Sequence, residues 1–217
     1  RAAVRPLFSG GNQARLLKGG DELFAAMVEG IRMARHQVWL ATYIYTDEGA
    51  VREVTRALTD AARRGVQVKL VLDGFGCRSD LPGLRPLLEE SGVQLAVFRP
   101  LERWWSWFRP GQLRRLHQKM CVVDGTVAFV GGINLIDDQD DVALGRLKAP
   151  RLDFSLRVAG PLVSDMADTM EQLWWRLQAL LICLKPSSMT GGHSVAEDHN
   201  ERGSTTKEAP WNSPWHC

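Results

Sequence analysis

A histidine, a lysine, an aspartate and an asparagine stand out in a largely apolar stretch of the sequence, RLHQKMCVVDGTVAFVGGIN, which covers residues 115–134. His117 and Lys119 lie two residues apart, Asp124 comes five residues after the lysine, and Asn134 follows a pair of glycines. A neutral imidazole nitrogen can attack phosphorus. An ammonium and a carboxamide can donate hydrogen bonds to phosphoryl oxygens as negative charge builds. These residues therefore predict a site for a phosphate ester, and this chemistry requires no metal or other cofactor.

The spacing of these residues also predicts where they lie on a sheet. Side chains alternate across a strand, so His117 and Lys119 are expected on the same face. Asp124-Gly125 is a tight-turn dipeptide between two apolar runs and predicts a hairpin. The return strand ends at the glycine pair 131–132, so Asn134 is expected beside the histidine and the lysine, at one end of the sheet.

The rest of the first half alternates helical and strand-like patterns, which predicts an α/β fold with right-handed crossovers. We expect a mixed, mainly parallel β-sheet flanked by helices. The first helix is expected to begin with Asp21 as its cap. Amphipathic or short helices are expected at 21–36, 51–64, 81–91 and 161–181, and strands at 37–45, 65–74, 92–98 and 153–160.

The composition limits the protein class. The chain has 217 residues and a formal net charge of +2, too small to indicate a nucleic-acid partner by itself. No apolar run reaches the length of a membrane-spanning helix, and the four cysteines show no zinc-ligand spacing. Residues 1–182 are expected to form a catalytic half-domain. Residues 183–217 are rich in Ser, Thr, Gly, Pro and charge, and are expected to be disordered.

The polar residues carry a resemblance to a known family. His117-x-Lys119-x4-Asp124 followed by GGIN resembles the signature of the phospholipase D superfamily. The wider context, from about residue 12 to 182, is similar to the N-terminal half of bacterial cardiolipin synthases. It includes VWLATYIYTDEGAVREVTRALTDAARRGVQVKLVLDGFG and DFSLRVAGPLV. The resemblance implies a phospholipase D-like fold.

The resemblance implies roles for the matching residues. His117 would be the catalytic nucleophile, or the general acid that protonates the leaving oxygen. Lys119 and Asn134 would bind the phosphoryl oxygens, and Asp124 would complete the catalytic motif from a structural position behind it. Asp153 would orient the histidine from the second shell around the site, although it also reads as a strand-start carboxylate near an arginine.

The resemblance implies a phosphatidyltransferase that uses anionic phosphatidylglycerol at the cytoplasmic face of the bacterial inner membrane. Synthases of this family carry two such motifs that share one site, whereas this sequence contains one H-x-K. Activity would then need a homodimer or a second catalytic half. The alternatives are a homodimeric nuclease or phosphodiesterase of the same superfamily, and an inactive half-domain.

One segment before the motif suggests contact with a membrane surface. Residues 99–115 contain five arginines, three tryptophans and a phenylalanine, and this mixture fits the headgroup layer of an anionic membrane. The expected membrane-contact residues are Arg103, Trp104, Trp105, Trp107 and Phe108. Packing against the core or a nucleic-acid groove would use the same residue types. The acidic run 136–141 lacks the spacing of a calcium loop and is expected to be a solvated loop.

Overall fold

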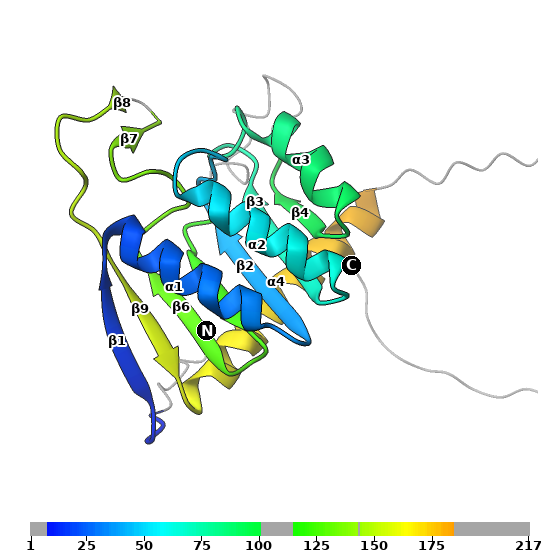
Figure 1. Ribbon diagram of the computed structural model, residues 1–217. Coiled ribbons are helices and arrows are strands. Elements are labelled where there is room, and N and C mark those ends of the chain that lie inside the picture. The colour runs from blue at the N-terminus through cyan, green and yellow to red at the C-terminus, as the bar shows by residue number, and fades with distance from the viewer. Residues whose placement is uncertain (1–7, 101–114, 143, 185–217) are drawn as a thin grey trace, which may run out of the picture. The chain divides into compact units, whose positions relative to one another are not determined.

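The computed structural model describes residues 8–100, 115–142 and 144–184, within a compact unit that ends at Leu184. Seven strands form one sheet in the order β1-β9-β6-β5-β2-β3-β4 (Figure 1). These strands are β1 (Gln13–Lys18), β2 (Gln37–Thr42), β3 (Gln67–Asp73), β4 (Gln94–Phe98), β5 (Met120–Val123), β6 (Val127–Gly131) and β9 (Phe154–Ala159). Two short strands, β7 (Asp140–Asp141) and β8 (Gly145–Arg146), pair separately.

The expected mixed sheet flanked by helices is confirmed, but the expectation that it is mainly parallel is wrong. The pairs β2–β3 and β3–β4 are parallel, as the strand–helix–strand pattern predicts. The four other neighbouring pairs are antiparallel. The β5–β6 hairpin and the returning β9 extend the sheet without helical crossovers, so the parallel pairing stops at β2.

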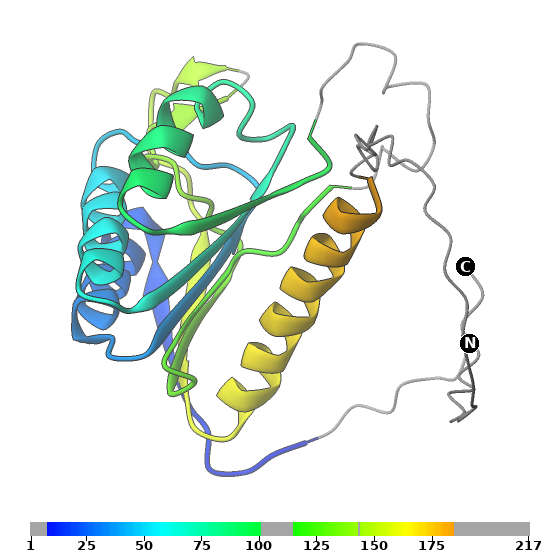
Figure 2. The same cartoon turned by 90° about the vertical axis from the view of Figure 1, so that its right-hand side faces the viewer.

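Helices cover both faces of the sheet. The helices α1 (Gly19–Met33), α2 (Val51–Arg63) and α3 (Leu81–Glu90) lie on one face, and α4 (Leu162–Leu184) lies on the other (Figures 1 and 2). Two buried clusters correspond to these layers. The larger contains Phe24, Leu58 and Leu88 from the three helices. The smaller contains Met170 and Trp174 from α4, packed on strand residues such as Trp39.

The start of α1 differs from the expectation. The helix begins at Gly19 rather than at Asp21, and the residue at its N-cap makes no side-chain capping bond. The carboxylate of Asp138 instead accepts the Gly20 backbone N–H, at 2.6 Å. Asp138 belongs to the acidic run that was expected to be a solvated loop. At least this carboxylate therefore holds a helix start, where negative charge is favourable.

Three further expectations concern the tail, the cysteines and membrane-spanning helices. The disordered tail is predicted to begin at residue 183, but α4 continues to Leu184. Residues 185–217 lie outside the described residues. Cys77 and Cys121 are buried free thiols. In the described ranges, no helix has both the length and the apolar character that a bilayer crossing requires.

Candidate active site

The segment 115–119 leads directly into β5 and carries the histidine and the lysine. Its backbone is fixed one residue before the histidine, because the Leu116 N–H donates to the Asp73 carboxylate at 2.8 Å. Asp73 ends β3 and is fully buried. Its other carboxylate oxygen accepts the backbone N–H groups of Phe75 and Gly76. A buried carboxylate with backbone donors thus ties the end of β3 to the motif.

His117 is exposed, and its imidazole stacks on the ring of Tyr43. The ring centroids are 5.4 Å apart and the planes meet at 17°. Tyr43 follows directly after β2, so this contact sets the ring of His117 beside the end of the central strand. The stacking leaves the edge of the imidazole, which carries both nitrogens, clear of the contact face.

Lys119 lies next to the histidine and is half-buried. Its Nζ donates to the His117 carbonyl oxygen at 3.1 Å and lies 5.9 Å from the centroid of the Tyr43 ring. Burial lowers the pKa of Lys119 below its ordinary value of 10.5, and the negative charge of Asp153 offsets part of this effect. The lysine is therefore a cation beside the imidazole, and a carboxylate supports its charge.

Asn134, which follows β6, reaches the chain just after β2. Its Oδ1 accepts the Ile44 backbone N–H at 3.2 Å, so the carboxamide NH2 group can donate to a ligand. An isolated parallel bridge between Tyr45 and Leu135 holds the two segments together. Tyr43 and Ile44 thus contact all three predicted phosphate-site residues, His117, Lys119 and Asn134.

The glycine pair predicted to end the return strand allows a close approach of Asp153. Gly131 N–H donates to the Lys119 carbonyl oxygen and Gly132 N–H to the Phe154 carbonyl oxygen. A Cβ at Gly132 would overlap the carboxylate of Asp153. Asp153 also accepts the Phe154 N–H at 2.8 Å. The negative charge of Asp153 favours the charged form of Lys119.

Asp124 does not join this cluster. It lies at the opposite end of β5, in the predicted hairpin turn, with a positive φ of 49°. Its carboxylate accepts the backbone N–H groups of Arg35, His36 and Gln37 at 2.8, 2.9 and 2.8 Å. Burial alone would raise the pKa of Asp124, but these hydrogen bonds outweigh it and lower the pKa. Asp124 thus anchors the start of β2 and does not contact the reacting groups.

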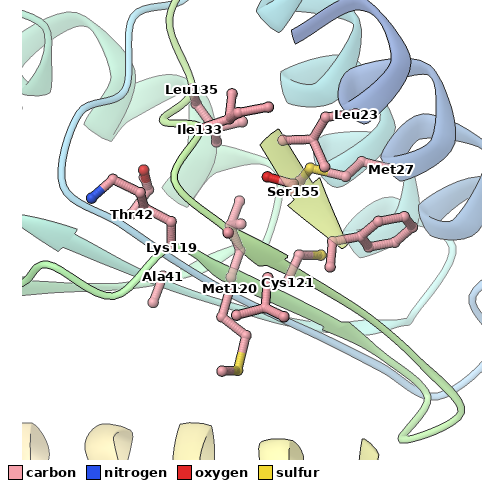
Figure 3. Close-up of a pocket in the computed structure, with 14 residues that line it drawn as sticks. Leu23, Met27, Ala41, Thr42, Lys119, Met120, Cys121, Ile133, Leu135 and Ser155 are labelled. Carbon is pink, nitrogen blue, oxygen red and sulfur yellow. The ribbon is translucent and has the colours of Figure 1, made fainter. Parts of the chain in front are cut away.

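A small pocket of about 20 Å³ lies behind the site, between the sheet and α1 (Figure 3). In Figure 3, Lys119 and Thr42 lie on the side away from Leu23 and Met27. A cavity of this size holds one water molecule and no lipid. This pocket is therefore too small for a lipid, whereas His117 itself is exposed.

Sequence reasoning did not identify Tyr43 or Asp73 as parts of the site. A tyrosine after a strand and an aspartate before a glycine are common, and only their contacts across the sheet distinguish them. The predicted membrane-contact residues 103–108 lie outside the described residues. Among the residues that the structure describes, no group of three side chains could hold a metal ion.

Comparison with known sequences identifies the family. Residues 27–140, more than half of the chain, match the family model described as cardiolipin synthase, PLD-like domain. The chain is 32% identical over 176 residues to cardiolipin synthase B of Salmonella typhi, covering 76% of this chain and 41% of that protein. It is 32% identical over 180 residues to cardiolipin synthase A of Pseudomonas fluorescens, covering 82% and 36%. The chain thus spans about two-fifths of the length of these relatives.

Solved structures share the fold. The phospholipase D family member Nuc of Salmonella typhimurium superposes with a TM-score of 0.54 at 16% identity, covering 77% of this chain and 95% of that one. NucT of Helicobacter pylori gives a TM-score of 0.56 at 16% identity, covering 77% and 96%. The family model covers more than half of the chain, and the shared fold agrees with it: the chain belongs to the cardiolipin synthase, PLD-like domain family.

Proposed function

We propose that the chain supplies one half of a phosphatidyl-transfer site. In this proposal the donor is phosphatidylglycerol, and its phosphatidyl group passes through His117 to a hydroxyl of a second lipid. The observation that carries the proposal is the exposed imidazole of His117, stacked on Tyr43 and adjoined by the Lys119 ammonium. A nucleophile needs an open approach and fixed orientation, and this arrangement supplies both.

The reaction divides into two displacements at phosphorus. A neutral imidazole nitrogen of His117 forms a P–N bond while the bond from phosphorus to the leaving glycerol oxygen breaks. The leaving oxygen takes a proton from a general acid. The acceptor hydroxyl then gives up its proton to the same group and attacks phosphorus, which breaks the P–N bond and frees the histidine. These steps use no metal or cofactor.

The neighbouring side chains stabilise the charge that develops on the phosphoryl oxygens. Lys119 supplies a cation, and the Asn134 carboxamide supplies N–H donors because its oxygen is already occupied by Ile44. Asp153 acts on Lys119, whose charge it favours. We therefore propose that Asp153 supports the charge of Lys119, instead of orienting His117 as the resemblance implies.

The general acid belongs to a second half-site. The sequence contains one H-x-K, at residues 117–119. A second copy of this chain, related by twofold symmetry, would bring a second His117 to the site. A further catalytic half of the kind that two-motif synthases carry would do the same. We place the protein peripherally on the cytoplasmic face of a bacterial inner membrane, with residues 103–108 at the lipid surface.

The test is transfer from labelled phosphatidylglycerol in vesicles, followed by quenching in alkaline denaturant to trap label on the protein and by acid treatment to release it. His117→Ala should abolish both the transfer and the protein-bound label. His36→Ala is the matched control, since the His36 side chain is also exposed but lies at the other end of β2. Full transfer by His117→Ala would remove this histidine from the mechanism.

A nuclease or phosphodiesterase acting as a homodimer is the second candidate. The observation that favours it is the single H-x-K at residues 117–119, which two copies of the chain could combine in one site. Binding to single-stranded DNA without binding to anionic vesicles would favour this candidate over lipid transfer. A strictly monomeric chain without turnover on either substrate would support an inactive half-domain.

A further inference from the structure

A third cationic residue belongs to the row that contains His117 and Lys119. Leu116 packs in the cluster under α4, and the Gln118 amide lies 3.7 Å from the sulfur of Met170 on the same helix. Arg115, His117 and Lys119 alternate with these two residues and contact other partners, the rings of Phe75 and Tyr43. The H-x-K pattern is therefore part of a longer R-x-H-x-K pattern, in which Arg115, His117 and Lys119 form one row of cationic-type side chains.

Arg115 shares an aromatic ring with a second arginine. The guanidinium carbon of Arg115 lies 4.7 Å from the centroid of the Phe75 ring, and that of Arg78 lies 5.1 Å from the same centroid. Phe75 follows Asp73 at the end of β3, so both cations lie beside the motif. Stacking on an aromatic ring holds a guanidinium in place while its N–H groups remain available.

Within the described ranges, neither Arg115 nor Arg78 forms an ion pair. The ion pairs of the described residues involve other arginines: Arg32, Arg56, Arg63, Arg85 and Arg146. The Nη1 atom of Arg115 is buried and has no hydrogen-bond partner, although the residue as a whole is only half-buried. An unsatisfied buried donor is costly, and a small shift of the guanidinium would let an incoming anion satisfy it.

The nearby carboxylate of Asp73 does not neutralise the positive charge of both Arg115 and Arg78. Asp73 accepts three backbone N–H groups, from Phe75, Gly76 and Leu116. Burial and Asp73 raise the pKa of Tyr43, while Arg115 and Arg78 lower it. Both guanidiniums are thus within electrostatic reach of the phenol that stacks on His117, and one carboxylate stands against two arginines.

We propose that Arg115 and Arg78 form a second anion subsite, which binds the phosphodiester of the acceptor phospholipid while the residues around His117 bind the donor phosphate. This inference rests on the proposed phosphatidyl transfer, because an acceptor such as phosphatidylglycerol carries a phosphate of its own. Residues two apart on an extended segment are about 7 Å apart. That spacing suits two phosphate groups joined through one glycerol, as in the transfer product.

A pair of soluble probes tests the subsite without turnover. Glycerol 1,3-bisphosphate carries two phosphates on one glycerol, and glycerol 1-phosphate carries one. Calorimetry on the full chain at fixed salt should show tighter binding of the bisphosphate, by about tenfold or more, since each charge-assisted pair contributes on that scale. Arg115→Gln should reduce the bisphosphate affinity to that of the monophosphate.

The control is Arg63→Gln, which removes the same charge at the far end of α2, where Arg63 pairs with Asp60. It should keep the preference for the bisphosphate. Equal affinities for the two probes in the wild-type chain, or a preference that survives Arg115→Gln, would overturn the subsite. Loss of transfer in the wild-type chain with the preference intact would reject the catalytic proposal and support the subsite.

Discussion

At the residue scale, the charge of Lys119 links the site to pH. Burial lowers the pKa of Lys119 below 10.5, and Asp153 partly offsets that shift. The ammonium is present below this lowered pKa and is lost above it. Phosphate binding should therefore decline on the alkaline side at a lower pH than for an exposed lysine. Asp153→Asn removes the offset, so the pKa of Lys119 should fall further.

The measurement is a titration of the Lys119 side chain by NMR, with inorganic phosphate binding followed over the same pH range. Asp168→Asn is the control, because Asp168 is exposed on α4. It should leave the titration unchanged. A titration of Lys119 that is the same in Asp153→Asn and the wild type would show that Asp153 does not support this charge.

Some site residues could be predicted from the sequence and others could not, for physical reasons. His117, Lys119 and Asn134 stand out because polar residues at fixed spacing in a strand pattern are rare. Tyr43 and Arg115 contact residues that are distant in the chain, His117 and Phe75. A tyrosine or an arginine is too common for its residue type alone to indicate such a contact. No local pattern distinguishes an arginine that stacks on Phe75 from one that faces solvent.

At the element scale, the helices and parallel strands were predictable because each carries its own apolar period. β1 was not predicted, since only Leu17 of its residues is buried. Its place is set by antiparallel pairing with β9, from Gln13 against Ala159 to Lys18 against Phe154. That register joins segments about 140 residues apart along the chain, and edge strands carry little local signal.

The hairpin between β5 and β6 supports a prediction about stability. Asp124→Asn keeps a residue that tolerates the positive φ but removes the charge and one acceptor from the three backbone donors. We expect a loss of about 1–2 kcal/mol in the free energy of unfolding at neutral pH. Because the folded pKa of Asp124 is below 3.8, its contribution is complete above 3.8 and is lost as the pH falls through the folded pKa.

Urea denaturation of the wild type and the variant at several pH values measures this effect. The difference between them should close as the pH falls below 3.8. Asp60→Asn is the control: its carboxylate forms an exposed pair with Arg63 and should contribute less than about 1 kcal/mol. A difference that stays constant down to the acid limit would mean that the charge of Asp124 is not what stabilises the turn.

At the scale of the whole molecule, the proposal makes catalysis depend on two histidines, while this sequence has one H-x-K. If two copies of the chain form the site, each site contains two His117 residues. Mixing equal amounts of wild-type and His117→Ala chains, with exchange between copies, then leaves about a quarter of the pairs with both histidines. Transfer should fall to about a quarter of that given by the same total amount of wild-type chain.

A site that needs only one histidine would instead retain about half of the transfer under the same conditions. Mixing with His36→Ala chains should cause no loss, because this exposed histidine lies away from the site. Light scattering on the same samples relates the activity to the fraction of paired chains. A fall to one half would contradict the shared site, since each copy would then be catalysing alone. A fall to one quarter needs both imidazoles in one reaction, with one attacking phosphorus and the other protonating the leaving oxygen.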